Sequence, residues 1–345
     1  MMRIGIMTGG GDCPGLNAVI RAIVRKGDAV YGDEFIGFLD SWDGVMAQRF
    51  IELPASAVRG LLPRGGTILG TRRGSPYDSK DGVQEVQKCF SEQRLDALIV
   101  IGGNGSLTVS SLLFAETHLP IVGVPKTIDN DVFGTELSFG FHTAVQIATD
   151  AIDRLHTTAE SHDRVMVVEL MGRDTGWIAV YAGLAGGATV ILIPEEPFDI
   201  AEVCAEVASR HQGGRFASIV VVAEGAQPIV GTMTPIDYAT DHLGRPRYGG
   251  VCVGIAEEIE KRTGFEARVV QIGHVQRGGT PTAFDRILCT RFGLAAVDAV
   301  HEGAFGYMVS LDATKISRVP LSDVVGKIRT VDLEFFHEIG DVFFG

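Results

Sequence analysis

The sequence predicts an α/β protein of two Rossmann-like lobes with largely parallel sheets. Three observations predict this class. Short apolar runs alternate with amphipathic stretches, several of these runs end in glycine-rich loops, and 345 residues are long for one hydrophobic core. Strands of a parallel sheet are buried on both faces, so helices are expected to cover both sides of each sheet.

The expected strands are short runs of β-branched and aliphatic residues. They are Ile4–Thr8, Ala97–Ile101, Ile121–Val124, Val165–Leu170, Val190–Ile193, Ile219–Ala223 and Val269–Ile272. The expected helices carry apolar residues at helical spacing. They are Asn17–Lys26, Gly82–Gln93, Thr143–Thr158, Ile200–Arg210 and Val253–Arg262. The polar stretch Thr232–Gly250 interrupts this alternation and is expected to be a surface excursion.

The composition of the chain limits the classes of molecule that it is expected to bind. A net charge of −13 argues against a general nucleic-acid or membrane-surface binder, because both need basic faces. The five cysteines are scattered without metal-ligand spacing, as in a reduced cytoplasm, where the protein is expected. No stretch approaches the ~20 apolar residues that span a bilayer, and the segment before the first glycine loop is too short for a signal peptide.

The segment Pro125–Asp131 is the most informative part of the chain. It follows an expected strand and places Lys126, Thr127, Asp129 and Asp131 at the edge where open α/β sheets bind ligands. One aspartate can accept a hydroxyl proton while the other orients groups or holds a metal. The structural alternative is a turn in which both aspartates cap backbone amides.

Two glycine loops follow expected strands, at Gly9–Asn17 and Gly102–Ser106. Backbone amides and a helix N-terminus suit a phosphate in each case, although both loops also fit ordinary tight turns. The first loop is neither a Walker A motif nor GxGxxG, and the absence of GxGxxG disfavours a dinucleotide-binding oxidoreductase.

Basic residues border the strands and loops. Arg72 and Arg73 follow a third glycine-rich stretch and suit a transferring phosphoryl group, or are surface charges. Further candidates for gripping a sugar phosphate lie at expected strand ends, and each alone is also compatible with a surface role. These are Arg164, Arg173, Arg268, His274 and Arg277, with Glu224 as a hydrogen-bond acceptor for sugar hydroxyls.

Taken together, these motifs resemble those of the 6-phosphofructokinases, in order along nearly the whole chain. The matching segments are Gly10-Gly11-Asp12-x-Pro14-Gly15-Leu16-Asn17-Ala18, Gly65-Gly66-Thr67-x-Leu69-Gly70, Thr127-Ile128-Asp129-Asn130-Asp131, Met171-Gly172-Arg173-x-x-Gly176 and Gly273-His274-x-Gln276-Arg277-Gly278-Gly279. The polar excursion resembles an insertion of the actinobacterial and pyrophosphate-type branch.

The resemblance implies phosphoryl transfer from ATP with Mg²⁺ to the 1-hydroxyl of fructose 6-phosphate. Asp129 would be the general base, supported by Thr127 and Asp131, while Arg73 would neutralise the phosphoryl group. The implied sugar-phosphate residues are Arg164, Met171, Gly172, Arg173, Glu224, Arg268, His274 and Arg277, with Arg173 also counted among the catalytic residues. The implied donor-side residues are Gly11, Trp42, Arg73, Gly103, Gly105, Ser106 and Lys126, with Trp42 beside the purine.

The resemblance also implies how the chain is organised. Residues 1–140 with about 276–325 would form the phosphoryl-donor lobe, and 141–275 with about 326–345 the sugar-phosphate lobe. Arg164 and Arg268 match positions that the family contributes from a neighbouring subunit, so a homotetramer is expected.

Two departures from the family pattern matter. Asn104 stands where the family has an acid that serves Mg²⁺, so weaker metal binding is expected. The donor signals conflict: Lys126 is the pyrophosphate-type residue, whereas Gly105 replaces the Asp that accompanies pyrophosphate use. We expect ATP to be the phosphoryl donor. An Asp at position 105 would exclude the nucleotide by its size and charge, and this effect should discriminate between donors more strongly than the positive charge that Lys126 adds.

The alternatives are a pyrophosphate-dependent phosphofructokinase, a kinase for another sugar phosphate such as sedoheptulose 7-phosphate, and a catalytically impaired sugar-phosphate sensor. Gly105 with Lys126 motivates the first, and Asn104 motivates the last.

Overall fold

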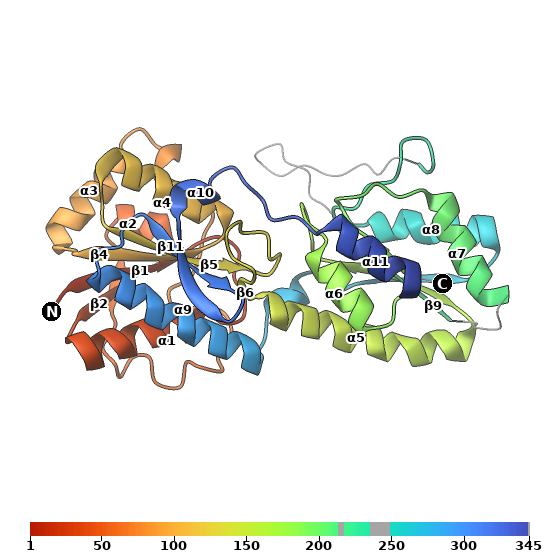
Figure 1. The fold of residues 1–345 in the computed structure, drawn as a ribbon, viewed down its shortest axis with the longest axis horizontal. Helices are drawn as coiled ribbons and strands as arrows, with labels where there is room; N and C mark the ends of the chain where they lie inside the picture. Colours follow the sequence, from red (N-terminus) through yellow and green to blue (C-terminus); the bar gives the residue numbers. More distant parts are fainter. Residues whose placement is uncertain (213–216, 235–248, 344–345) are drawn as a thin grey trace. The chain divides into compact units, whose positions relative to one another are not determined.

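The structure is a computed structural model and describes residues 1–212, 217–234 and 249–343. It divides into two compact units (Figure 1). The first holds Met1–Thr143 and Arg277–Arg329, and the second holds Ala144–Gln276 and Thr330–Gly345. The backbone therefore passes between the units after Thr143, after Gln276 and after Arg329.

The first unit contains a largely parallel sheet with strand order β12-β11-β5-β4-β1-β2-β3, and β6 pairs with β5. Only the β2–β3 and β11–β12 pairs along that order are antiparallel. The strands are β1 (Arg3–Thr8), β2 (Glu34–Phe38), β3 (Phe50–Glu52), β4 (Ala97–Gly102), β5 (Ile121–Thr127), β6 (Phe139–Gly140), β11 (Tyr307–Asp312) and β12 (Lys315–Pro320).

Helices cover both faces of this sheet, with α1 and α9 on one side and α3 and α4 on the other (Figure 1). The helical segments are α1 (Leu16–Lys26), η1 (Gly27–Tyr31), α2 (Trp42–Met46), η2 (Pro76–Asp78), α3 (Gly82–Gln93), α4 (Asn104–Thr117), α9 (Ala283–His301) and α10 (Leu321–Val324). One core cluster joins Met7, Phe38 and Leu98 of the sheet to Val86 and Leu113 of the helices. Burying each such side chain stabilises the fold by about 1.5–3 kcal/mol.

The second unit contains an all-parallel sheet with strand order β10-β7-β9-β8. Its strands are β7 (Val165–Leu170), β8 (Val190–Leu192), β9 (Ser218–Ala223) and β10 (Ala267–Gln271). Helices α7 and α8 pack on one face, and α5 and α6 lie on the other (Figure 1). The helical segments are α5 (Phe141–His162), α6 (Trp177–Ala185), α7 (Ile200–Gln212), α8 (Val251–Thr263), η3 (Gly273–Arg277) and α11 (Leu333–Phe343).

The predicted α/β class with largely parallel sheets is confirmed. Each expected strand and helix is present: Val165–Leu170 and Gly82–Gln93 have the expected bounds, and the others differ by one to four residues at an end. Residues 235–248 of the expected surface excursion lie outside the described part. One local prediction is wrong: β5 continues to Thr127, so Lys126 and Thr127 lie in the strand rather than in a turn after it. The pairing of Lys126 and Thr127 with β6 extends the strand.

A buried carboxylate fixes the start of α5. Asp285 accepts hydrogen bonds from the backbone nitrogens of Gly140 at 3.1 Å and Thr143 at 2.8 Å. Its side chain thus satisfies free amides at a helix N-terminus, where negative charge is also favoured by the helix dipole. Because Gly140 pairs with Thr127, this carboxylate also supports the strand that leads into residues Thr127–Asp131, which we call the acid segment.

Candidate active site

The first glycine loop lies against the start of α4. Thr8 of β1 pairs with Ile101 of β4, and the Gly9 nitrogen donates to the Ile101 carbonyl at 2.9 Å. A Cβ at Gly9 would lie 2.4 Å from the Ser106 hydroxyl oxygen, so no larger residue fits without a shift. The two glycine loops predicted to bind phosphate are therefore adjacent at one sheet edge.

The loop that carries the arginine pair is tied to this glycine loop. The Thr71 hydroxyl donates to the Gly10 carbonyl at 2.6 Å, and the Gly10 nitrogen donates to the Arg72 carbonyl at 3.4 Å. The Arg72 side chain lies 4.0 Å from Asp40 and 3.7 Å from Asp43, whereas Arg73 is exposed and forms no ion pair within the described ranges. Of the two arginines, Arg73 has the guanidinium available to an anion.

The acid segment has a fixed backbone. The Thr127 hydroxyl accepts from the Asp129 nitrogen at 3.1 Å, and Asn130 adopts a left-handed conformation with φ 53°. The Asn130 side-chain oxygen accepts from the Ser138 nitrogen at 2.9 Å, while the Ser138 hydroxyl donates to the Thr127 carbonyl at 2.8 Å. Asn130 and Ser138 were not predicted, although a polar residue between two acids in such a turn is the available signal.

Asn104 lies beside the second acid. Its amide nitrogen donates to the Asp131 carboxylate at 2.8 Å, while its side-chain oxygen is buried without a hydrogen-bond partner among the described atoms. Burial, and then the neighbouring Asp129 charge, raise the pKa of Asp131 to about 6. The structure thus brings together two carboxylates and an unpaired amide oxygen.

Two cations flank the glycine loop. Lys126 is 3% exposed and donates to the Gly11 carbonyl at 2.5 Å, and its burial lowers the pKa of its amine. The Arg277 guanidinium donates to the Asp12 carbonyl at 3.4 Å, and a Cβ at Gly11 would lie 2.6 Å from it. Two cationic side chains therefore lie against the glycine loop. The family resemblance of the sequence places Arg277 among the sugar-phosphate residues and not at this loop.

The remaining donor-side residues differ in accessibility. Gly105 is exposed in the first turn of α4, and a Cβ there would meet no atom within 4 Å. Gly103 precedes that helix, and Ser106 is buried against the first loop. Trp42 is only 1% exposed and packs in the core of the first unit, so in this structure its indole offers no open face to a purine.

Several predicted sugar-phosphate residues gather at one edge of the second sheet. Leu170 pairs with Ala223, so Met171 and Glu224 leave the sheet side by side. The Glu224 nitrogen donates to the Leu170 carbonyl at 2.8 Å, and the Gly225 nitrogen donates to the Gly172 carbonyl at 3.0 Å. Arg173 continues the first of these loops. His274, exposed, follows β10 at the same edge.

Arg164 and Arg268 lie at the opposite edge of that sheet. Arg164 directly precedes β7, and Arg268 is the second residue of β10. Both guanidinium groups contact the Glu266 carboxylate, with a distance of 2.9 Å for Arg164. The six residues of β7 span roughly 20 Å, so these arginines do not share a site with Met171 and Glu224 of the same chain.

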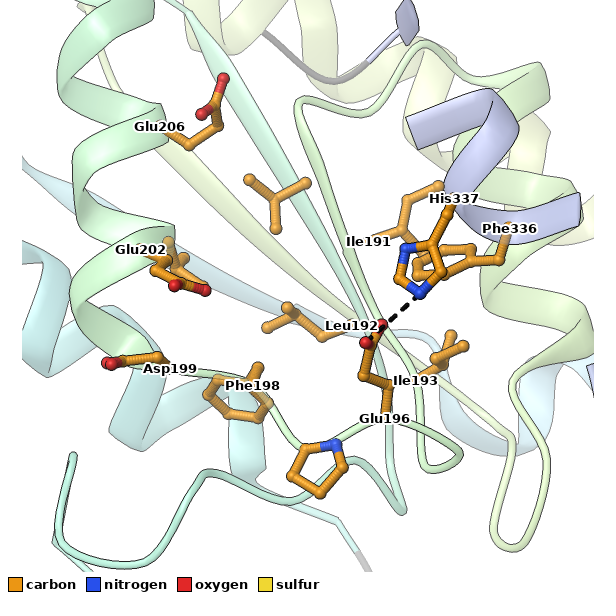
Figure 2. A pocket seen from close by; sticks show the side chains of 13 residues that line it. Ile191, Leu192, Ile193, Glu196, Phe198, Asp199, Glu202, Glu206, Phe336 and His337 are labelled. Atoms are coloured by element: carbon orange, nitrogen blue, oxygen red, sulfur yellow. Dashed lines mark ion pairs between the residues drawn. The ribbon is translucent and has the colours of Figure 1, made fainter. Parts of the chain in front are cut away.

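A separate cavity of about 350 Å³ lies in the second unit. It combines an apolar floor from β8 with acidic side chains at its rim, and Glu196 pairs with His337 at 3.4 Å (Figure 2). None of the predicted site residues lines it.

The side-chain oxygens beside Asp131 decide whether the site can hold a divalent cation. The described residues contain no group of three or more His, Cys, Asp or Glu side chains suited to a metal ion. The unpartnered Asn104 oxygen and the Asp131 carboxylate nevertheless fit Mg²⁺, which is often bound by one or two protein oxygens together with substrate phosphates. Within the described residues, no helix combines the length and apolar character needed to cross a membrane.

Known proteins resemble this chain throughout its length. A family model described as phosphofructokinase matches residues 3–300. A pyrophosphate–fructose 6-phosphate 1-phosphotransferase of Streptomyces coelicolor is 56% identical over 344 residues and covers 100% of both chains. ATP-dependent 6-phosphofructokinase 3 of the same organism is 53% identical over 330 residues and covers 96% of each chain.

A solved structure gives the same fold. The T-state phosphofructokinase of Pichia pastoris matches with a TM-score of 0.82 and 34% identity over 94% of this chain. This chain spans 35% of the yeast polypeptide.

Proposed function

Because the chain belongs to the phosphofructokinase family, we propose that it transfers a phosphoryl group from ATP to the 1-hydroxyl of fructose 6-phosphate, forming fructose 1,6-bisphosphate. The observation that carries this proposal is the acid segment, in which Asp129 follows a parallel strand beside the glycine loops and their cations. Phosphoryl transfer needs little covalent chemistry from the protein, so catalysis comes from positioning and charge.

Asp129 would accept the proton of the sugar hydroxyl as that oxygen attacks phosphorus. The Thr127 hydroxyl holds the Asp129 nitrogen, and Asn130 and Ser138 fix the turn, so the carboxylate needs little reorganisation to act. Asp131 would stay beside Asp129 as a second carboxylate that orients donor groups.

The donor phosphates would bind on the amides of the Gly9–Asp12 loop and at the start of α4. Lys126 and Arg277 supply charge against the loop, and the exposed Arg73 would neutralise the group in transfer. The loop amides, Lys126 and Arg277 are held in place, so they can stabilise a developing negative charge without reorganising.

Mg²⁺ would be held by the Asn104 side-chain oxygen and the Asp131 carboxylate together with donor phosphates, and it supplies charge neutralisation when bound. An amide carries no charge, so the protein contributes less to metal affinity here than a carboxylate would.

The sugar phosphate would be held by the loops of the second unit that carry Met171, Gly172, Arg173, Glu224 and His274. Arg164 and Arg268 lie at the far edge of that sheet, which supports their assignment to the site of a neighbouring subunit. A homotetramer with shared sites is part of this proposal.

ATP is the proposed donor because of the open space at Gly105, where a side chain would compete with a nucleotide. Pyrophosphate is the second candidate: the buried Lys126 reaches the glycine loop, and relatives named for the two donors are 56% and 53% identical.

The deciding experiment measures initial rates of the pure full-length protein with fructose 6-phosphate, Mg²⁺ and either ATP or pyrophosphate. ATP-dependent turnover at least tenfold faster than with pyrophosphate is expected, and turnover with pyrophosphate alone would overturn the donor assignment. Binding of fructose 6-phosphate without turnover would instead favour an impaired sensor, and turnover only with another sugar phosphate, such as sedoheptulose 7-phosphate, would move the acceptor assignment.

A further inference from the structure

The third passage of the backbone between the units is a short segment, Arg329–Thr330–Val331, which we call the strap. Arg329 is the last residue of the first unit, and Thr330 begins the final part of the second. The backbone N–H groups of the residues on both sides of Thr330 each donate a hydrogen bond within their own unit.

The first end of the strap is bonded to the acid segment. The Arg329 nitrogen donates to the Asp131 carbonyl at 2.9 Å, and its guanidinium donates to the Asn130 carbonyl at 3.4 Å. The preceding Ile328 forms an antiparallel bridge with Val132. Residues 328–329 therefore extend the backbone pairing of the turn that presents Asp129 and Asp131.

The second end is bonded to Glu195. The Val331 nitrogen donates to one Glu195 carboxylate oxygen at 2.9 Å, and the Gly176 nitrogen lies 3.0 and 2.9 Å from the two oxygens. Gly176 ends the loop that begins at Met171 and precedes α6. One carboxylate thus joins the strap to the loop proposed to hold the sugar phosphate.

The strap continues into a well-packed element. Val331 is 3% exposed, and Phe336 of α11 is 7% exposed. In Figure 2, Phe336 and His337 lie beside side chains of β8, where His337 pairs with Glu196. The second end is therefore anchored by burial as well as by the Glu195 bond.

Only Thr330 separates the two anchored residues. Three consecutive Cα atoms span at most about 7.6 Å, so the strap limits how far Val331 can move from Arg329. A shift of Val331 larger than rotation about the Thr330 backbone can absorb must either be transmitted to the acid segment or break one of the anchoring hydrogen bonds.

From this geometry we propose that the strap mechanically couples the Met171–Gly176 loop to the Thr127–Asp131 segment, with Glu195 as a positioning residue. The proposal rests on the proposed function only in naming the chemistry of the two ends. It predicts that a change at Glu195 alters the backbone dynamics of the acid segment in the other unit.

The test is hydrogen–deuterium exchange of the full-length protein without ligand, followed in a peptide covering residues 127–132. Glu195→Ala removes the acceptor for both backbone donors and is expected to raise exchange in that peptide by roughly threefold or more. Glu196→Ala is the matched control. The Glu196 carboxylate pairs with His337 and not with the strap, so this variant should leave exchange in the peptide unchanged.

A second variant separates coupling from a general loss of stability. Inserting Gly-Ser-Gly between Thr330 and Val331 leaves both anchors intact but gives the strap slack. In that background, adding Glu195→Ala should no longer change exchange in the 127–132 peptide. If Glu195→Ala affects only peptides of the second unit, or acts equally with the insertion, the coupling is refuted.

Glu195→Gln keeps one acceptor oxygen and serves if the alanine variant does not fold. It should give a smaller increase in the same peptide, and no increase would count against the proposal.

In rate measurements, Glu195→Ala should lower kcat by roughly tenfold through misplacement of the acid segment. If wild-type protein shows no turnover, the proposed function fails while the exchange result still decides the coupling.

Discussion

The side-chain amide of Asn104 donates a 2.8 Å hydrogen bond to the Asp131 carboxylate and leaves its own oxygen buried without a partner among the described atoms. The amide adds no charge beside the two neighbouring acids. Burial, and then the charge of Asp129, raise the pKa of Asp131.

Replacing Asn104 with Asp tests how the amide affects the metal. The variant adds a third acid beside Asp129 and Asp131, so Mg²⁺ should bind more tightly, by roughly tenfold in the concentration that gives half-maximal rate. Mn²⁺ binding measured by electron paramagnetic resonance with nucleotide present should shift in the same direction. Unchanged metal dependence in both measurements would remove Asn104 from the proposed metal site.

The raised pKa of Asp131 predicts how stability depends on pH. Its folded pKa, about 6, lies above the ordinary value of 3.8, so the folded state holds this proton more tightly. The stabilisation is complete below about pH 4 and is lost as pH rises through 6. Asp131→Asn, which cannot ionise, should therefore gain free energy of unfolding relative to wild type between pH 4 and 7. Denaturant unfolding at several pH values measures this, and a pH-independent difference would contradict it.

Parts of this site were predictable because they depend on local order along the chain. Asp129 and the glycine loops follow apolar strands, and the ends of parallel strands meet at one sheet edge. The Asn104–Asp131 bond depends instead on how the start of α4 lies beside the turn that follows β5, because the two residues are 27 positions apart in the sequence. The strap was equally invisible, because Arg329 and Val331 bind through backbone nitrogens that any residue except proline carries.

The residues the sequence placed on the donor side also separate in the structure for physical reasons. Trp42 has the aromatic surface for a purine, yet the core of the first unit buries it. Lys126 belongs to the otherwise apolar strand β5, where its buried amine donates a hydrogen bond to the Gly11 carbonyl. Side-chain type alone does not reveal which of these outcomes applies.

Asp129→Asn tests the proposed general base. The amide preserves size but cannot accept a proton, so kcat should fall by about 10²–10⁴-fold, with little change in the KM for fructose 6-phosphate. Steady-state kinetics and thermal unfolding of the same samples check this. Asp163→Asn, an exposed left-handed position outside the site, is the matched control and should retain wild-type rates.

Gly105→Asp tests the donor assignment. The new carboxylate would enter open space in the first turn of α4, where acids are tolerated in the fold but repel nucleotide phosphates. We expect kcat/KM for ATP to fall by about 100-fold, or about 2.7 kcal/mol, because a bound nucleotide would bring its phosphates against a negatively charged carboxylate. Gly105→Ala adds a methyl group without charge and should lose far less. Equal losses in the two variants would point to space rather than charge.

Mixing two inactive variants tests whether Arg164 and Arg268 serve a neighbouring subunit. One chain carries Asp129→Asn, and the other carries Arg164→Ala with Arg268→Ala; both ion pairs with Glu266 are partly exposed, so the fold should tolerate their loss. If each site takes its base from one chain and its arginines from the next, a mixed interface contains one intact site. Random reassembly then restores about a quarter of wild-type activity, since half of the interfaces are mixed and each has two sites. The control mixes chains that carry Asp129→Asn with chains that carry Thr127→Val. Each site takes both of these positions from a single chain, so this mixture should recover no activity. Recovery absent from both mixtures, in reassembled oligomers confirmed by mass, would place the arginines outside any shared site.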